Sequence, residues 1–102
     1  MRVVLTDEAE QQLDEIYRFI AARSYKERAA AYVGRILAQC ARLEHFPERG
    51  TRRDDIRPGL RTIGFERRVT IGFTVEPDAV VIHGILYGGQ DIEAALGEPD
   101  EG

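Results

Sequence analysis

The chain has 102 residues, a formal net charge of −4 and 43% hydrophobic residues. This length fits a single small domain with one modest core, and no apolar run approaches the roughly 20 residues that span a bilayer. The single cysteine, Cys40, excludes an internal disulfide, and His45 and His83 lack metal-ligand spacing, so we expect no metal site. The acidic N-terminus does not resemble a signal peptide, which predicts a cytoplasmic protein.

The chain begins with a predicted strand and helix. Residues 2–5 are mostly β-branched or apolar, which is typical of a short strand. Thr6 fits an N-cap, and the acids of the next turn suit the positive end of a helix dipole. The spacing predicts a helix over 7–22, whose apolar face comprises Ala9, Leu13, Ile16, Tyr17 and Ile20.

A second helix is predicted directly after the first. Ser24 and Glu27 fit a capping box at its start, and Pro47 predicts its end near Phe46. Because the connection is short, the two helices should form an antiparallel hairpin. The predicted apolar face of the second helix comprises Ala30, Val33, Ile36, Leu37, Cys40 and Leu43.

From Gly50 the hydrophobic period changes to that of strands. Residues 60–65, 69–75 and 79–87 predict three strands joined by short turns, which implies an antiparallel meander. A short helix is expected over 91–96, with Asp91 as its N-cap. The predicted fold is therefore α+β, with an N-terminal strand, an antiparallel helical hairpin and a three-stranded antiparallel meander.

We expect this fold to form one domain over residues 1–96. Residues 97–102 are predicted to be an acidic flexible tail. The last twelve residues hold five acids and no base. No Walker motif, nucleophile elbow or dinucleotide fingerprint is present, so no cofactor is expected.

Positive charge gathers between residues 49 and 68. This segment holds seven arginines against three acids, a net +4, although the whole chain is acidic. Such a cluster favours an anionic partner, either nucleic acid or an acidic protein. The alternative is a solvated loop with internal ion pairs to Asp54 and Asp55. The candidate binding arginines are Arg49, Arg52, Arg53, Arg57, Arg61, Arg67 and Arg68.

Two further side chains are candidates for proton transfer or binding. His83 and Tyr87 lie at i and i+4 of the last predicted strand, which predicts one shared face and a separation of about 13 Å. That distance is too long for direct cooperation on one bond. His83 is expected to sit on a partly buried face, whereas Tyr87 ends the strand, where an aromatic ring can stack on a partner. Cys40 is expected to pack in the core.

Four segments in order resemble the ParE branch of the RelE/ParE superfamily. LTDEAEQQLDEIYRFIA is similar to the family's first helix, and LEHFPERG to its helix end followed by Pro-x-x-Gly. Leu60-Arg61 followed by VTIGFTV resembles the arginine-led central hairpin, and IHGILYGGQD the last strand and C-terminal segment. The chain departs from the family at Tyr87, where histidine is frequent, and at Gln90, where arginine is common.

The resemblance implies a toxin of a type II toxin–antitoxin module that poisons DNA gyrase. It also implies a ParD-like antitoxin that neutralises the toxin in a hetero-oligomer. The arginines of residues 49–68 and Tyr87 would then contact the antitoxin or the target, and residues after Tyr87 would help to engage the target. No catalytic residue is required for this activity.

The alternative is a ribosome-dependent mRNA endonuclease like those of the RelE branch. Arginines would then hold the scissile phosphate and stabilise charge in the transition state, while a tyrosine or His83 would serve proton transfer. The chain lacks the lysines and the C-terminal histidine–tyrosine pair that this branch typically combines. The catalytic candidates under this alternative are Arg61, Arg67, Arg68 and Tyr87.

Overall fold

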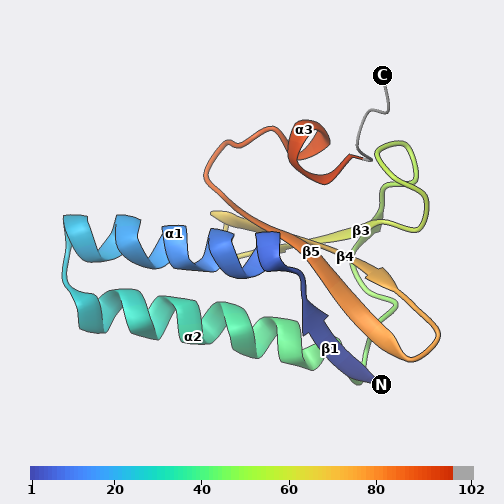
Figure 1. The fold of residues 1–102 in the computed structure, drawn as a ribbon, viewed down its shortest axis with the longest axis horizontal. Coiled ribbons are helices and arrows are strands. Elements are labelled where there is room, and N and C mark those ends of the chain that lie inside the picture. The colour runs from blue at the N-terminus through green and yellow to red at the C-terminus, as the bar shows by residue number, and fades with distance from the viewer. Residues whose placement is uncertain (98–102) are drawn as a thin grey trace.

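A computed structural model describes residues 1–97 of the chain, shown in Figure 1. The predicted α+β fold is confirmed, with an N-terminal strand, two long antiparallel helices and a meander. Of the predicted acidic tail 97–102, only Gly97 falls within the described residues. The elements are β1 (Arg2–Leu5), α1 (Asp7–Arg23), α2 (Lys26–Arg42), β2 (Thr51–Arg52), β3 (Arg61–Phe65), β4 (Val69–Val75), β5 (Ala79–Tyr87) and α3 (Ile92–Leu96).

The five strands form one sheet in the order β1-β5-β4-β3-β2. The meander β3-β4-β5 is antiparallel throughout, as its short turns predict. β1 pairs with β5 in parallel, from Arg2 opposite Ala79 to Leu5 opposite Ile82. The two-residue strand β2 was not predicted, and it pairs antiparallel with the start of β3.

Helix α1 begins as its cap predicts and is tied to the sheet at that point. The Thr6 side-chain oxygen accepts from the Ala9 amide at 3.1 Å. The same hydroxyl donates to the His83 carbonyl oxygen at 3.4 Å, and the Thr6 amide donates to the Ile82 carbonyl at 3.0 Å. The start of α1 is therefore held against β5 by both the backbone and the side chain of Thr6.

The predicted capping box of α2 is wrong. Ser24 instead ends α1, where its amide donates to Ile20, and Tyr25 is the N-cap of α2 without a side-chain bond. Because only two residues connect the helices, Ser24 is already used by the end of α1. Within the part of the chain that the structure describes, no helix combines the length and apolarity needed to cross a bilayer.

The predicted end of α2 near Phe46 is also wrong, since the helix stops at Arg42. The amide of Leu43 donates to Cys40 and that of Glu44 to Ala41, three residues back, so the last turn tightens well before Pro47. The buried face is shifted as well. Ala29, Ile36, Cys40 and Leu43 are buried, whereas Ala30 and Leu37 are exposed.

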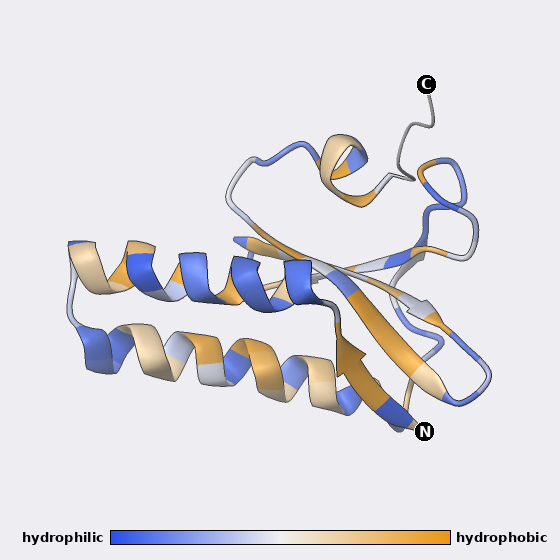
Figure 2. Ribbon diagram, viewed as in Figure 1, coloured by the Kyte–Doolittle hydropathy of each residue, from blue (hydrophilic) through white to orange (hydrophobic). Residues whose placement is uncertain are grey.

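Two hydrophobic clusters lie on opposite faces of the sheet. The larger lies under the helical hairpin and joins Leu13 and Ile16 of α1 with Ile71 and Phe73 of β4. The smaller comprises Leu60, Leu86 and Leu96 and lies under α3. Figure 1 shows α3 and the helical hairpin on opposite sides of β5, and Figure 2 shows β1 and β5 as the most continuous hydrophobic segments.

A β-bulge in β5 changes which side chains share a face. Gly72 of β4 lies opposite Gly84, but the next residue, Phe73, lies opposite Ile82, so His83 is an extra residue on β5. Tyr87 packs on the helical side, whereas the His83 ring contacts Thr74 on the other side. The prediction that His83 and Tyr87 share a face is therefore wrong, because simple alternation fails across a bulge.

Leu96 anchors α3 on a patch of the sheet that lacks side chains. A Cβ added to Gly84 would lie 2.5 Å from Leu96 Cδ2, and one added to Gly72 would lie 2.5 Å from Leu96 Cδ1. Asp91 caps the helix, as predicted, by accepting from the amides of Glu93 and Ala94. The absence of two side chains on the sheet thus sets the height at which α3 packs.

This contact predicts a specific double-mutant result. Gly84→Ala should reduce the free energy of unfolding by about 1–3 kcal/mol, because a methyl group overpacks the site of Leu96. Leu96→Ala should cost roughly 2–5 kcal/mol through lost burial and a cavity. The double variant should lose clearly less than the sum, since the smaller side chain leaves room for the methyl group. Urea denaturation measures all three values, and strict additivity would contradict the predicted contact.

Candidate functional site

Two of the seven arginines pair within their own loop. Arg52 contacts the Asp54 carboxylate at 3.2 Å, and Arg53 contacts the Asp55 carboxylate at 3.0 Å. A hydrogen bond donated by the Gly59 amide, and then one from Arg52, lowers the pKa of Asp54, and Arg53 lowers the pKa of Asp55. The internal pairing considered from the sequence is thus confirmed for these two arginines, whose charge is locally offset.

The other five arginines do not form one patch. Arg49 is exposed beyond α2, and Arg57 lies beside His83. Arg67 and Arg68 are exposed in the turn between β3 and β4. Arg61 is half-buried at the opposite end of β3, four residues from Phe65, which corresponds to about 13 Å of strand.

Arg68 and Tyr87 are one pair of candidate residues that the fold brings together, and Arg57 and His83 are another. The Gly88 amide donates to the Arg68 carbonyl at 2.8 Å, which joins the β3–β4 turn to the end of β5. Both side chains line one pocket. In the same turn Glu66 and Arg67 adopt positive φ angles of 47° and 64°, the sign pattern that type I′ hairpin turns require.

His83 is held in a chain of polar contacts on the α3 side of the sheet. Its Nδ1 lies 3.5 Å from the Arg57 guanidinium, and its Nε2 lies 2.8 Å from the Thr74 hydroxyl. Thr74 in turn donates to Glu76 at 3.1 Å. Because Arg57 has only donors, these contacts fit a neutral imidazole with its proton on Nε2. Burial and then the charge of Arg57 lower the pKa of His83 below its ordinary value of 6.5.

Tyr87 lies on the helical side among aromatic rings. Its ring centroid lies 5.5 Å from Phe19 and 6.2 Å from Tyr32, with an edge-on orientation to Tyr32. Aromatic pairs at these separations stabilise a fold by more than the burial of the rings alone. The Tyr87 ring therefore joins the end of β5 to both long helices and is not free to swing outward.

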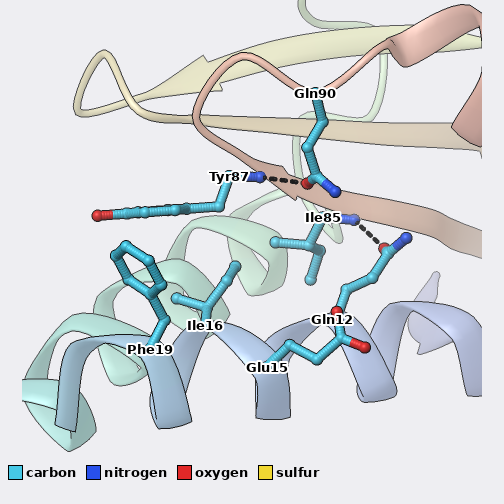
Figure 3. Close-up of a pocket in the computed structure, with 7 residues that line it drawn as sticks. All are labelled: Gln12, Glu15, Ile16, Phe19, Ile85, Tyr87 and Gln90. Atoms are coloured by element: carbon cyan, nitrogen blue, oxygen red, sulfur yellow. Dashed lines mark hydrogen bonds between the residues drawn. The ribbon is translucent and has the colours of Figure 1, made fainter. Parts of the chain in front are cut away.

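One pocket beside Tyr87, the Gln12 pocket, lies along the edge of β5 that β1 leaves uncovered. Figure 3 shows Gln12 and Gln90 reaching this edge, where they accept from the amides of Ile85 and Tyr87 at 2.7 Å and 2.9 Å. Two glutamine side chains thus replace the backbone partners that a longer β1 would supply. The pocket measures about 270 Å³ and is lined by Gln12, Glu15, Ile16, Phe19, Ile85, Tyr87 and Gln90.

A second pocket, the arginine pocket, lies on the other side of Tyr87. It measures about 300 Å³ and is lined by Ile20, Arg28, Tyr32, Arg35, Arg68 and Tyr87. The α2 residues of this pocket are not among the candidates predicted from the sequence. Arg28, Tyr32 and Arg35 recur at i, i+4 and i+7, a spacing that places them on one face of a helix and that could have revealed them.

The structure also shows the surroundings of Cys40 and of the possible metal ligands in the described part of the chain. Cys40 packs in the core as expected, and burial raises the pKa of its thiol to about 11, which disfavours the reactive thiolate. Among residues 1–97, no group of three or more His, Cys, Asp or Glu side chains is arranged to hold a metal ion.

The contacts of His83 predict how stability depends on pH. Because its folded pKa is lowered, the unfolded chain binds the proton more tightly, so stability should fall as pH drops through 6.5 toward the folded pKa. Arg57→Gln should raise the His83 pKa, as an NMR titration of the ring protons would measure. His83→Gln is the control, and it should remove this part of the pH dependence. An unchanged His83 pKa in Arg57→Gln would contradict the assigned contact.

Comparisons with known proteins agree with the fold and with the sequence resemblance. Residues 3–92 match the family described as the ParE toxin of the type II toxin–antitoxin system parDE. Toxin ParE3 of Caulobacter vibrioides is 33% identical over 97 residues, covering 95% of this chain and 96% of that protein.

A solved structure gives independent support. It is described as the chromosomal ParDE toxin–antitoxin system from P. aeruginosa, and its matching chain superposes with a TM-score of 0.76 at 28% identity. The match covers 86% of this chain and 96% of that chain. This chain therefore belongs to the ParE toxin family of type II toxin–antitoxin systems.

Proposed function

We propose that this ParE-family toxin acts in the cytoplasm by binding and inhibiting DNA gyrase. We also propose that a ParD-like antitoxin neutralises it in a hetero-oligomeric complex. Family membership supports a toxin with an antitoxin partner. The choice of a binding mechanism rests on how the polar side chains are arranged.

The observation that carries the proposal is the separation of Arg61 and His83 from Arg68 and Tyr87, which share one pocket. Arg61 lies about 13 Å along β3 from Phe65, the residue that precedes the turn with Arg68. Phe65 pairs with Val69 of β4, which in turn lies opposite Tyr87. His83 lies on the other face of the sheet with both ring nitrogens in polar contacts. A general base and a phosphate-binding arginine must reach the same reacting group. Arg68 and Tyr87 do share a pocket, but Tyr87 is packed between Phe19 and Tyr32, and neither Arg61 nor His83 joins them. This incomplete set of catalytic groups is our reason for proposing binding over RNA cleavage.

Exposed apolar side chains support a protein partner on the helical hairpin and the adjoining edge. Phe46 is 64% exposed and Met1 48% exposed, and both line one pocket of about 400 Å³ with Pro47 and Val75. Phe19 and Leu37 on the two helices are also more than 40% exposed. Apolar side chains gathered at a surface are typical of protein interfaces, and an antitoxin is the partner we assign to them.

The segment after Tyr87 is the part that we assign to the target. Leu96 and its neighbours hold α3 on the sheet, while Glu93 and Ala94 remain exposed. Because Leu96 fixes α3 on the sheet, the exposed side chains of α3 are held in a defined geometry and can contact a partner. Truncation after Tyr87 would remove Leu96 from its cluster, so surface substitutions test this assignment more cleanly than truncation does.

The first experiment is induced expression in a bacterium that carries a DNA-damage reporter, with total mRNA followed in parallel. Growth arrest, reporter induction and intact mRNA are the expected results, because poisoned gyrase leaves broken DNA. Co-expression of the cognate antitoxin should restore growth. Rapid loss of mRNA with a silent reporter would overturn the proposal in favour of a nuclease, for which Arg61→Ala and Tyr87→Phe should abolish cleavage.

A second experiment locates the target surface with purified toxin and gyrase. Ala94→Arg should weaken inhibition of supercoiling at least about tenfold, since a bulky charge at a tight interface costs about 1.4 kcal/mol or more. Ala38→Arg, at an exposed position of α2, is the matched control and should inhibit like the wild type. Equal inhibition by both variants would remove α3 from the interface.

A further inference from the structure

The arginine pocket holds more positive charge than its surroundings offset. Arg28, Arg35 and Arg68 all line it. Arg35 is paired in a bidentate contact with Glu66, at 2.8 Å and 3.2 Å. Among residues 1–97, Arg28 and Arg68 have no carboxylate within ion-pair distance. The pocket therefore presents two guanidinium groups whose charge has no partner in the described chain.

Tyr32, which also lines the pocket, carries a polar atom that lacks a partner in the described chain. The Tyr32 hydroxyl is buried and makes no hydrogen bond in the described chain. Its ring is held by Tyr87 on one side and by the Arg35 guanidinium, 5.2 Å from the ring centroid, on the other. Burial raises the pKa of Tyr32, so the hydroxyl stays protonated and remains a donor. Buried polar groups without partners are uncommon because they are costly.

The missing acceptor and the uncompensated charges indicate the same kind of ligand. We propose that the arginine pocket binds a carboxylate of a partner protein, with Arg28 and Arg68 flanking the bound group and Tyr32 donating to it once the covered hydroxyl opens to the pocket. Arginine forks and a tyrosine hydroxyl are suited to a planar carboxylate. The identity of the partner as the antitoxin rests on the proposed function, whereas the carboxylate site itself does not.

The neighbouring surface favours a protein segment over nucleic acid. The Gln12 pocket lies directly across Tyr87, and its apolar lining of Ile16, Phe19 and Ile85 suits an aliphatic side chain. Glu15 lines the same pocket and would repel the phosphates of a nucleic acid strand. The chain as a whole is also acidic, at −4. An extended partner segment with an apolar residue close to an acidic one would fill both pockets.

The test uses the full chain labelled with ¹⁵N and three small probes at constant ionic strength. N-acetyl-glutamate amide offers a side-chain carboxylate, N-acetyl-leucine offers a C-terminal carboxylate, and inorganic phosphate offers the competing anion. At least one carboxylate probe should produce saturable shifts of the Arg28 and Arg68 Nε–Hε signals. The probe that binds more tightly identifies the carboxylate as that of a side chain or a C-terminus.

Two variants distinguish a binding role from a structural one. Tyr32→Phe should weaken carboxylate binding at least about tenfold, because a hydrogen bond to a charged group is lost. The same variant should unfold at equal or higher urea concentration, since it removes an unsatisfied buried hydroxyl. Arg68→Gln should weaken binding by a similar factor. Arg52→Gln is the control, because Arg52 is exposed in another loop and pairs with Asp54.

Three results would overturn the inference. One is an absence of saturable shifts with both carboxylate probes. Another is binding of phosphate alone, which would indicate a nucleic acid site. The last is a Tyr32→Phe variant that loses stability and binds as the wild type does. Because none of these measurements involves gyrase, a failure here is distinguishable from a failure of the proposed toxic activity.

Discussion

The structure depends on the burial of β5 on both of its faces. One face packs under the helical hairpin through Ile82 and Ile85, and the other packs under α3 through Leu86 and Gly84. Strands buried on both sides cannot alternate apolar and polar residues, and β5 accordingly reads as a nearly continuous apolar run. The cap of α1, the strands β1 and β4, helix α3 and the turn that carries Arg68 are all positioned against this strand.

The bulge at His83 shifts the alternation of β5, so that apolar side chains on both sides of the bulge reach the helical face. It places Val80 and Ile82 on the helical side before the extra residue, and Ile85 and Tyr87 on the same side after it. Without it, Tyr87 would fall on the side of α3, away from the aromatic rings of the helices. The separation of His83 from Tyr87 thus follows from one inserted residue.

Ion pairs between neighbouring residues decide which of the arginines of residues 49–68 keep an uncompensated charge. Arg52 and Arg53 each pair with an aspartate two residues further along the chain, Asp54 and Asp55. Exposed ion pairs of this kind contribute little to stability. Within the described residues, unpaired positive charge remains at Arg28 and Arg68, beside Tyr32 and Tyr87 at the junction of the helices and the β3–β4 turn. A protein that is acidic overall can in this way present a confined basic pocket to an acidic partner.

Much of this protein could be predicted from local patterns. The order of the elements, the Thr6 and Asp91 caps, the antiparallel meander and the burial of Cys40 all follow from interactions between residues close in sequence. The chosen cap of α2 failed because two residues had to serve two helix ends. The family resemblance came from motifs spread along the chain, and comparison confirmed it.

Only the tertiary structure decided which residues meet. The parallel pairing of β1 with β5, the bulge, and the separation of Arg61 from Arg68 depend on contacts between distant segments. The arginine pocket draws on α1, α2, a turn and the end of β5, so no local pattern contains it. The sequence by itself determined the elements, which are set by short-range preferences, and the family, which motifs spread along the chain identify. The arrangement of the charged groups depends on how the sheet packs against the helices, which joins residues far apart in the sequence.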